Sequence, residues 1–171
     1  MRRIGKRGAD TNLDVLLTTA DGWLFAIAST STEPYATSTK KSFLKPQYFS
    51  HNRSRWTDVG LPGCQAEAEQ IRSGHHRYTS LDVPQLLKHM LSLGRTGSRW
   101  TLCYLWYDVP GPAADAHRAE VTQFAAQIGG DAAHFMALTY QELFARMEPL
   151  AGEAHAKYLE ELRDRYINAE R

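Results

Sequence analysis

The chain has 171 residues, of which 43% are hydrophobic and 23% are charged, so it suits one domain with a buried core and is too apolar for wholesale disorder. It contains no apolar run of the roughly 18 residues that a membrane helix needs, and no apolar signal-peptide core follows its basic first eight residues. Two cysteines without a paired-cysteine motif disfavour both a disulfide framework and a zinc knuckle. We therefore expect a cytoplasmic protein with no membrane partner.

The net charge of +1 conceals an uneven distribution. Residues 1–57 contain nine basic and four acidic residues, whereas residues 58–171 contain eleven basic and fifteen acidic residues. The stretch 34–57 has no acidic residue, and its aromatic residues lie among basic ones. The basic residues are Lys40, Lys41, Lys45, Arg53 and Arg55. This pattern is typical of a surface that binds the DNA backbone, and a solvated loop would have the same composition.

The first predicted elements are two strands over residues 13–19 and 23–29, joined by a turn at Asp21-Gly22. Such a pair is expected to form an antiparallel hairpin. If the turn centres on Asp21, residues whose numbers add up to 42 face each other. Asp14 then lies opposite Ala28, and the side chains of Asp14, Ala28 and Thr30 point to one face of the sheet.

After a long loop, helices and strands alternate along the chain. The predicted elements are helices over residues 65–72, 82–94, 113–128 and 149–171, and strands over residues 98–109 and 135–138. Asp82 is the expected N-cap of the second helix, and Thr139 and Glu142 form a capping box for a further helix after the last strand. The strand over 98–109 is apolar on both faces and therefore central. The order predicts one α/β domain over residues 1–171, with a mixed sheet flanked by helices, a basic segment at 1–11 and a C-terminal amphipathic helix at 149–171.

Five blocks of sequence resemble a known group of proteins. They are Asn-Leu-Asp-Val-Leu at 12–16, Phe-Ala-Ile-Ala-Ser-Thr-Ser-Thr-Glu-Pro-Tyr at 25–35, Gly-Leu-Pro-Gly-Cys-Gln at 60–65, Gln-Leu-Leu-Lys-His at 85–89 and Leu-Trp-Tyr-Asp-Val-Pro-Gly at 105–111. Together they resemble a bacterial restriction-endonuclease-like group of the PD-(D/E)XK nuclease superfamily. The resemblance implies a restriction-endonuclease-like fold. Since only eleven residues precede Asn12, we expect the first helix and strand of the superfamily core to be missing.

The resemblance also assigns a metal site to the hairpin. The family Asp falls on Asp14, its Glu on Ala28 and its Lys on Thr30. In such nucleases the two carboxylates hold Mg²⁺, and the lysine activates or positions the attacking water. Ala28 offers no oxygen ligand and Thr30 no charge, so we expect Mg²⁺ binding to be weak or absent, with Asp14 as the remaining ligand.

Two further residues are candidates for this site. Glu33 could substitute for the missing acid, but it follows Thr30 by three residues and faces the other way in a regular strand, so a bulge or a bend at Pro34 would have to turn it. Gln65 opens a helix near the site, where it would either touch substrate or serve the helix itself.

Three functions remain open on the sequence. The chain is a nuclease-fold protein that binds DNA without cutting it, an active metal-dependent endonuclease with a displaced acidic ligand, or a protein-interaction module that reuses the fold. Loss of the first core strand would leave an exposed sheet edge, so a homo-oligomer is a further expectation.

Overall fold

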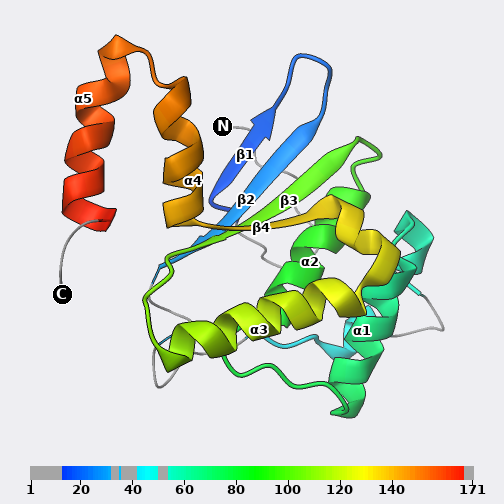
Figure 1. Ribbon diagram of the computed structural model, residues 1–171. Coiled ribbons are helices and arrows are strands. Elements are labelled where there is room, and N and C mark those ends of the chain that lie inside the picture. Colours follow the sequence, from blue (N-terminus) through cyan, green and yellow to red (C-terminus); the bar gives the residue numbers. More distant parts are fainter. Residues whose placement is uncertain (1–12, 32–34, 36–41, 50–53, 168–171) are drawn as a thin grey trace.

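The computed structural model describes residues 13–31, 35, 42–49 and 54–167, and its centre is a mixed sheet in the order β1-β2-β3-β4 (Figure 1). The strands are β1 (Val15–Thr18), β2 (Leu24–Thr30), β3 (Trp100–Trp106) and β4 (Phe135–Thr139). β1 is antiparallel to β2, whereas β2, β3 and β4 are parallel to one another. The predicted mixed α/β sheet is confirmed, and β3 is an internal strand that is buried along its whole length.

The helices lie on both sides of this sheet. They are α1 (Pro62–Ser73), α2 (Val83–Gly94), α3 (Pro112–Gln127), α4 (Tyr140–Met147) and α5 (Glu153–Leu162). Figure 1 shows α1, α2 and α3 grouped together, with α4 and α5 as a separate pair. Within the described residues, no helix combines the length and apolar character required to cross a bilayer.

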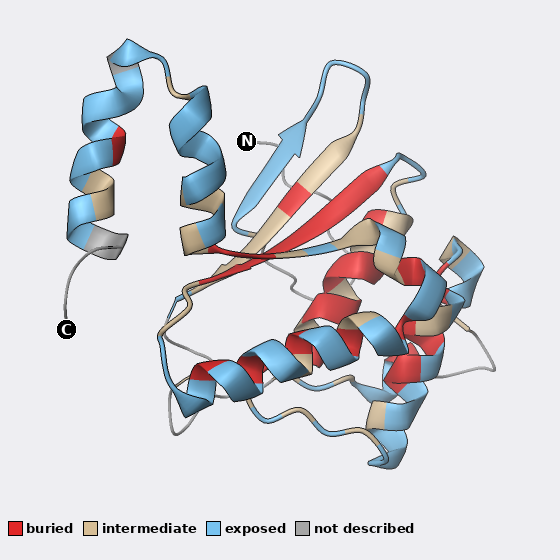
Figure 2. Ribbon diagram, viewed as in Figure 1, coloured by how far each residue is buried: buried red, intermediate tan, exposed pale blue. Residues whose placement is uncertain are grey.

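The main core lies between the sheet and helices α1 to α3. Even-numbered residues of β2 and β3 point into it, including Ala26, Leu102 and Tyr104, and they pack against apolar residues of the three helices. The opposite face has a much smaller core, in which Cys103 and Leu105 contact residues of α4. Figure 2 shows the contrast, with β3 buried and β1 exposed. One side of the sheet is therefore well covered and the other only in part.

The hairpin has the register that the sequence predicts. Every residue pair of β1 and β2 adds up to 42, from Val15 opposite Ile27 to Thr18 opposite Leu24. The turn explains why, because the Gly22 N–H donates to the Thr19 carbonyl (2.9 Å) and Gly22 adopts a φ of 82°. A left-handed residue at this position is what a three-residue hairpin loop requires, and glycine accepts it without strain.

Helix α1 is longer than predicted, because its N-terminal cap comes from a distant residue. The Cys64 N–H donates to the Asp131 carboxylate (2.8 Å), which belongs to the turn before β4. Gly63 allows this approach, since a Cβ there would lie 2.0 Å from the Ile128 carbonyl oxygen. The expected N-cap Asp82 and the capping box of Thr139 with Glu142 are both present.

The C-terminal helix expected over 149–171 is present in the described part but begins later, at Glu153. A 3₁₀ turn at Glu148–Leu150 precedes a break at Ala151–Gly152, and α5 continues from Leu162 into a π-helical turn at Arg163–Ile167. Leu159 is buried, whereas Tyr158 is 61% exposed. The physical reason is that α5 folds back beside the end of α4, where Arg163 pairs with Glu148 (2.8 Å), instead of lying on the main core. Residues 168–171 and the basic segment 1–11 lie outside the described residues.

Candidate functional site

Asp14 lies where the hairpin ends, directly before β1. Its N–H donates to the Ile27 carbonyl (3.0 Å), and its carboxylate accepts from the N–H (2.6 Å) and the hydroxyl (3.1 Å) of Ser29. The exposed Asp14 carboxylate thus accepts the Ser29 N–H in place of a backbone carbonyl of the neighbouring strand. This is the edge at which the parallel strands β2, β3 and β4 reach their carboxyl ends, and ligands of open α/β sheets bind at that edge.

Ala28 and Thr30, which the sequence resemblance assigns to the Glu and Lys of the nuclease motif, lie on the neighbouring strand. The observed pairing ends at Val15 with Ile27, so Asp14 and Ala28 are the next residues beyond the last pair, and Ala28 packs against the main core. On its other edge β2 pairs with β3, so Ala28 is next to Tyr104 and Thr30 is next to Trp106. The Tyr107 N–H donates to the Thr30 carbonyl (3.2 Å) and closes this end of the sheet.

A buried histidine that the sequence did not single out as a site residue lies on the same side of the sheet. His89 of α2 is 1% exposed, and a chain of hydrogen bonds reaches its ring. The Ser42 hydroxyl donates to Gln85 Oε1 (3.0 Å), and Gln85 Nε2 lies 3.2 Å from His89 Nε2. In this arrangement His89 Nε2 accepts, so the ring proton of the neutral imidazole is on Nδ1, which has no hydrogen-bond partner within the described residues.

The electrostatics of His89 connect it to Asp14. Burial and, to a lesser extent, the charge of Lys88 lower the pKa of His89 to about 4, against the opposite effects of Asp14 and Asp82. The imidazole is therefore neutral at pH 7 and lies within electrostatic reach of the Asp14 carboxylate. Trp106, beside Thr30, also has a buried ring nitrogen for which the described part of the chain offers no partner. Buried polar groups are normally hydrogen-bonded. The ring N–H groups of His89 and Trp106 are therefore available to donate to an acceptor atom of a ligand.

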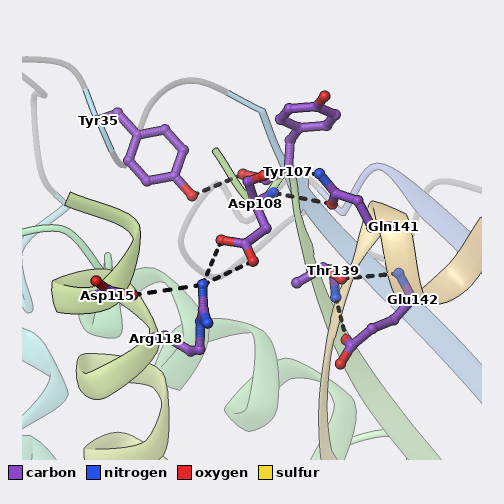
Figure 3. Close-up of polar contacts among 8 residues, drawn as sticks. All are labelled: Tyr35, Tyr107, Asp108, Asp115, Arg118, Thr139, Gln141 and Glu142. Carbon is purple, nitrogen blue, oxygen red and sulfur yellow. Dashed lines mark hydrogen bonds and ion pairs between the residues drawn. The ribbon is translucent and has the colours of Figure 1, made fainter. Parts of the chain in front are cut away.

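The chain that leaves β3 is fixed by polar contacts on both sides (Figure 3). The Tyr35 hydroxyl donates to the Tyr107 carbonyl (2.8 Å), and Arg118 donates to both carboxylate oxygens of Asp108 (2.9 Å each). The side-chain amide of Gln141 pairs with the backbone of Asp108, donating at 2.8 Å and accepting at 3.2 Å. The Asp108 carboxylate is thus occupied by a guanidinium.

The two remaining candidates for the site have different outcomes. Gln65 is buried and accepts from the Trp56 N–H (3.2 Å) while donating to Glu69 (2.7 Å), so its amide joins a loop to α1. Glu33 lies outside the described residues. In the parts of the chain that the structure describes, no three His, Cys, Asp or Glu side chains are arranged to hold a metal ion.

The basic stretch is described in part, and it has neighbours on two helices. Lys45 is exposed. Burial lowers the pKa of Lys88 of α2, Asp82 opposes this effect, and the charge of Lys45 adds a smaller lowering. Arg55 and Arg95 both lie within electrostatic reach of Tyr48. The candidates Lys40, Lys41 and Arg53 lie outside the described residues.

Cations from α1 and α2 therefore extend the basic stretch, and the sequence analysis missed them. Arg72 of α1 stacks on Phe49 with its guanidinium 4.7 Å from the ring centre, and Lys88 and Arg95 come from α2 and its C-terminal end. No periodic signal marks these residues, because they are far from residues 34–57 in the sequence. The combined basic surface of the helices and the loop can be recognised only in the folded structure, because its residues are distant in the sequence.

A comparison with known proteins gives the family. Residues 3–167 match the sequence profile of a family described as a restriction endonuclease associating with ARP, and the chain belongs to that family. Among curated proteins and among solved structures, no match to the chain is found.

Proposed function

Starting from membership of this restriction-endonuclease family, we propose that the chain is a DNA-binding protein of the PD-(D/E)XK type whose catalytic site is impaired. One observation carries the proposal, namely the hairpin register. The pairing of Val15 with Ile27 supports Asp14 and Ala28 as the next residues of the two strands, the positions at which the superfamily has two carboxylates. The described site offers one carboxylate, and Ser29 already donates to it.

A single carboxylate is a poor Mg²⁺ site. The ion sheds its hydration shell reluctantly, and it is usually held by one or two carboxylates together with substrate phosphates. Ala28 has no ligand atom, Asp108 is paired with Arg118, and the neutral imidazole of His89 is a poor ligand for a hard cation. The residues described here therefore do not fit the family metal, and we derive no catalytic step through it.

DNA binding rests on charge. Lys45, Lys88 and Arg95 are contributed by a loop and a helix that meet near Tyr48, and His89 lies within electrostatic reach of both Lys88 and Asp14. The cations and the hairpin end therefore share one region. Phosphate contacts of this kind give affinity without sequence preference.

A salt titration with duplex DNA tests the binding. The logarithm of the association constant should fall linearly with the logarithm of salt concentration between about 50 and 300 mM, with a slope of roughly −0.9 for each phosphate contact. Lys45→Glu and Lys88→Glu should each make the slope shallower by about one contact. Lys157→Glu, an exposed lysine of α5, is the matched control and should leave the slope unchanged. An affinity that does not respond to salt would contradict a phosphate-binding surface.

The family description favours one alternative, because it names an associated partner, ARP. On that reading the fold is an interaction module and the basic surface is incidental. The unaltered chain should then bind duplex DNA no better than the charge-reversed variants do. An active enzyme with a displaced acid is the other alternative, and Mg²⁺-dependent nicking of plasmid DNA that requires both Asp14 and Glu33 would establish it.

A further inference from the structure

Four aromatic residues of the basic stretch differ in their surroundings. Tyr48 and Trp56 are buried, with ring centres 5.7 Å apart. Phe49 packs beside Trp56, and the Arg72 guanidinium covers its ring. Phe43 is 67% exposed, the highest fraction of any phenylalanine, tyrosine or tryptophan in the described part of the chain. Three of these rings therefore belong to the packing of the loop, whereas most of Phe43 is open to solvent.

Phe43 is held outside the core by its neighbours on both sides. The Ser42 N–H donates to the Asp82 carboxylate (2.9 Å), and the Ser42 hydroxyl donates to Gln85 Oε1 (3.0 Å). On the other side, Leu44 packs against the main core. Because both neighbours are anchored, Phe43 is presented to solvent in a fixed place, and little conformational entropy is lost when a ligand contacts its ring.

Positive charge lies next to Phe43. Lys45 follows it by two residues, is exposed, and lies within electrostatic reach of Lys88 of α2. Gln85, which anchors the residue before Phe43, precedes Lys88 by three residues and so lies on the same side of α2. The carboxylate of Asp82, at the N-cap of this helix, is already engaged, since each of its oxygens accepts a backbone N–H. An exposed aromatic ring beside cations is the arrangement with which proteins hold unpaired nucleic acid.

We propose that Phe43 is a platform on which an unpaired base stacks, so that the basic surface holds single-stranded DNA by a base as well as by its phosphates. This inference rests on the proposed DNA binding and specifies the form of the DNA. Phosphates are available in both forms, but the faces of bases inside a duplex are covered by the neighbouring base pairs, whereas an unpaired base can turn its face to the ring. An acidic peptide would neutralise the cations equally well, but it offers Phe43 no base, and the experiment separates the two.

Removal of the Phe43 ring is the direct test. Fluorescence anisotropy, at a fixed salt concentration of about 100 mM, measures binding of the full-length chain to an oligothymidine of about 20 nucleotides and to a duplex of the same length. Phe43→Ala should weaken binding to the single strand by about tenfold, the effect expected for one stacked base, and should change binding to the duplex by less than about twofold. Phe43→Trp keeps an aromatic ring and should retain the affinity. Circular dichroism confirms that each variant is folded.

Two controls separate stacking from charge. Tyr158→Ala removes a 61% exposed ring from α5 and should leave binding to both forms unchanged. A strand of the same length made of abasic sites keeps the phosphates but has no bases, so the unaltered chain and Phe43→Ala should bind it equally weakly.

Three results would overturn the stacking proposal. Phe43→Ala could leave binding to the single strand unchanged, it could weaken binding to the duplex or the abasic strand as much, or the unaltered chain could bind the abasic strand as tightly as oligothymidine. Any of these results, with duplex binding still dependent on salt, refutes the stacking alone. The absence of salt-dependent binding to every form of DNA contradicts the proposed function as well.

Discussion

Two carboxylates of this protein have opposite surroundings. Glu120 of α3 accepts five hydrogen bonds, from the backbone and hydroxyl groups of Thr79 and Ser80 and from the Leu81 N–H, at 2.5 to 2.8 Å. Asp14 accepts two, both from Ser29 and both on one oxygen. Both oxygens of the Glu120 carboxylate accept hydrogen bonds. The Asp14 side chain is exposed, and among the described residues no donor contacts its second carboxylate oxygen.

The histidine near each carboxylate shows the same difference in hydrogen bonding. Beside Glu120, His117 is buried and both of its ring nitrogens have partners, Tyr104 (3.0 Å) and Ser80 (3.0 Å). On the Asp14 side, His89 has a buried ring nitrogen with no partner among the described residues. Trp106 has another, while Trp23 and Arg55, elsewhere in the molecule, carry the two remaining unpartnered buried nitrogens of the described part. The histidine beside Glu120 is therefore held by hydrogen bonds on both nitrogens, and the histidine on the Asp14 side is not.

The largest effect should follow from refilling the two altered positions. Ala28→Glu with Thr30→Lys should restore Mg²⁺ binding, measured by titration calorimetry, and Mg²⁺-dependent DNA cleavage above the background of the unaltered chain. Each charged group that stabilises a transition state is typically worth about 10²–10³ in rate. Adding Asp14→Ala should abolish both gains. Cleavage that persists after Asp14→Ala would show that the activity resides elsewhere.

Next in size is the removal of the Glu120 charge. Glu120→Gln leaves N–H and O–H donors facing an amide that cannot accept from them all, so the free energy of unfolding should fall by about 1–3 kcal/mol, a range reduced because the residue is half exposed. Urea denaturation at pH 7 measures this. Asp115→Asn, on the exposed side of α3, is the matched control and should change stability by less than about 0.5 kcal/mol.

The effect of Glu120 should also depend on pH with a definite sign. Burial would raise its pKa, but the hydrogen bonds from Thr79, Leu81 and Ser80 outweigh burial and lower the pKa to about 2. A lowered pKa means that the stabilisation is complete above the unfolded-state pKa of 4.5 and is lost as the pH falls toward 2. The difference between the unaltered chain and Glu120→Gln should therefore shrink across this window. A constant difference would contradict the role of the ionised carboxylate.

The sequence predicted the parts of this protein that depend on local rules. The hairpin register followed from Asp21-Gly22, and the caps of α2 and α4 followed from Asp82 and from Thr139 with Glu142. The same rules predicted a C-terminal helix but not its exposure, because the spacing of apolar residues identifies the apolar side of a helix without showing whether a core exists to bury that side. Leu150, at 83% exposed, has none.

Of the candidate site, the sequence predicted only the strand pairing of the hairpin that carries Asp14, Ala28 and Thr30. Asp14, Ala28 and Thr30 could be related by counting along two strands, whereas His89 and Lys88 join them from a helix whose position depends on the whole fold. The helix block at 85–89 was part of the resemblance, but its side chains carried no separate signal. Contacts between distant segments, such as Asp131 capping α1, are likewise invisible to periodicity.

A smaller effect should reveal whether His89 faces position 28. In the Ala28→Glu variant the new carboxylate can accept from the unpartnered His89 Nδ1–H, so the two side chains should stabilise each other by about 1 kcal/mol. A double-mutant cycle with His89→Leu measures this coupling by urea denaturation. His89→Leu alone removes an unpartnered donor but also the acceptor of the Gln85 hydrogen bond, so it should destabilise the chain by about 1 kcal/mol, and the cycle corrects for this cost. A coupling of zero would mean that the ring nitrogen does not reach the strand.

The smallest expected effect belongs to Asp14, and it completes the comparison with Glu120. Asp14→Asn keeps an oxygen for the Ser29 N–H and is exposed to water, so the free energy of unfolding should change by less than about 1 kcal/mol. Ser29→Ala removes one of the two donors and should have a similarly small effect. Urea denaturation of both variants and of Glu120→Gln compares how much each carboxylate contributes to the free energy of unfolding. If Asp14→Asn destabilised the chain as much as Glu120→Gln, the hairpin end would be a structural anchor. A carboxylate that costs little to remove from the fold is instead free to serve a ligand.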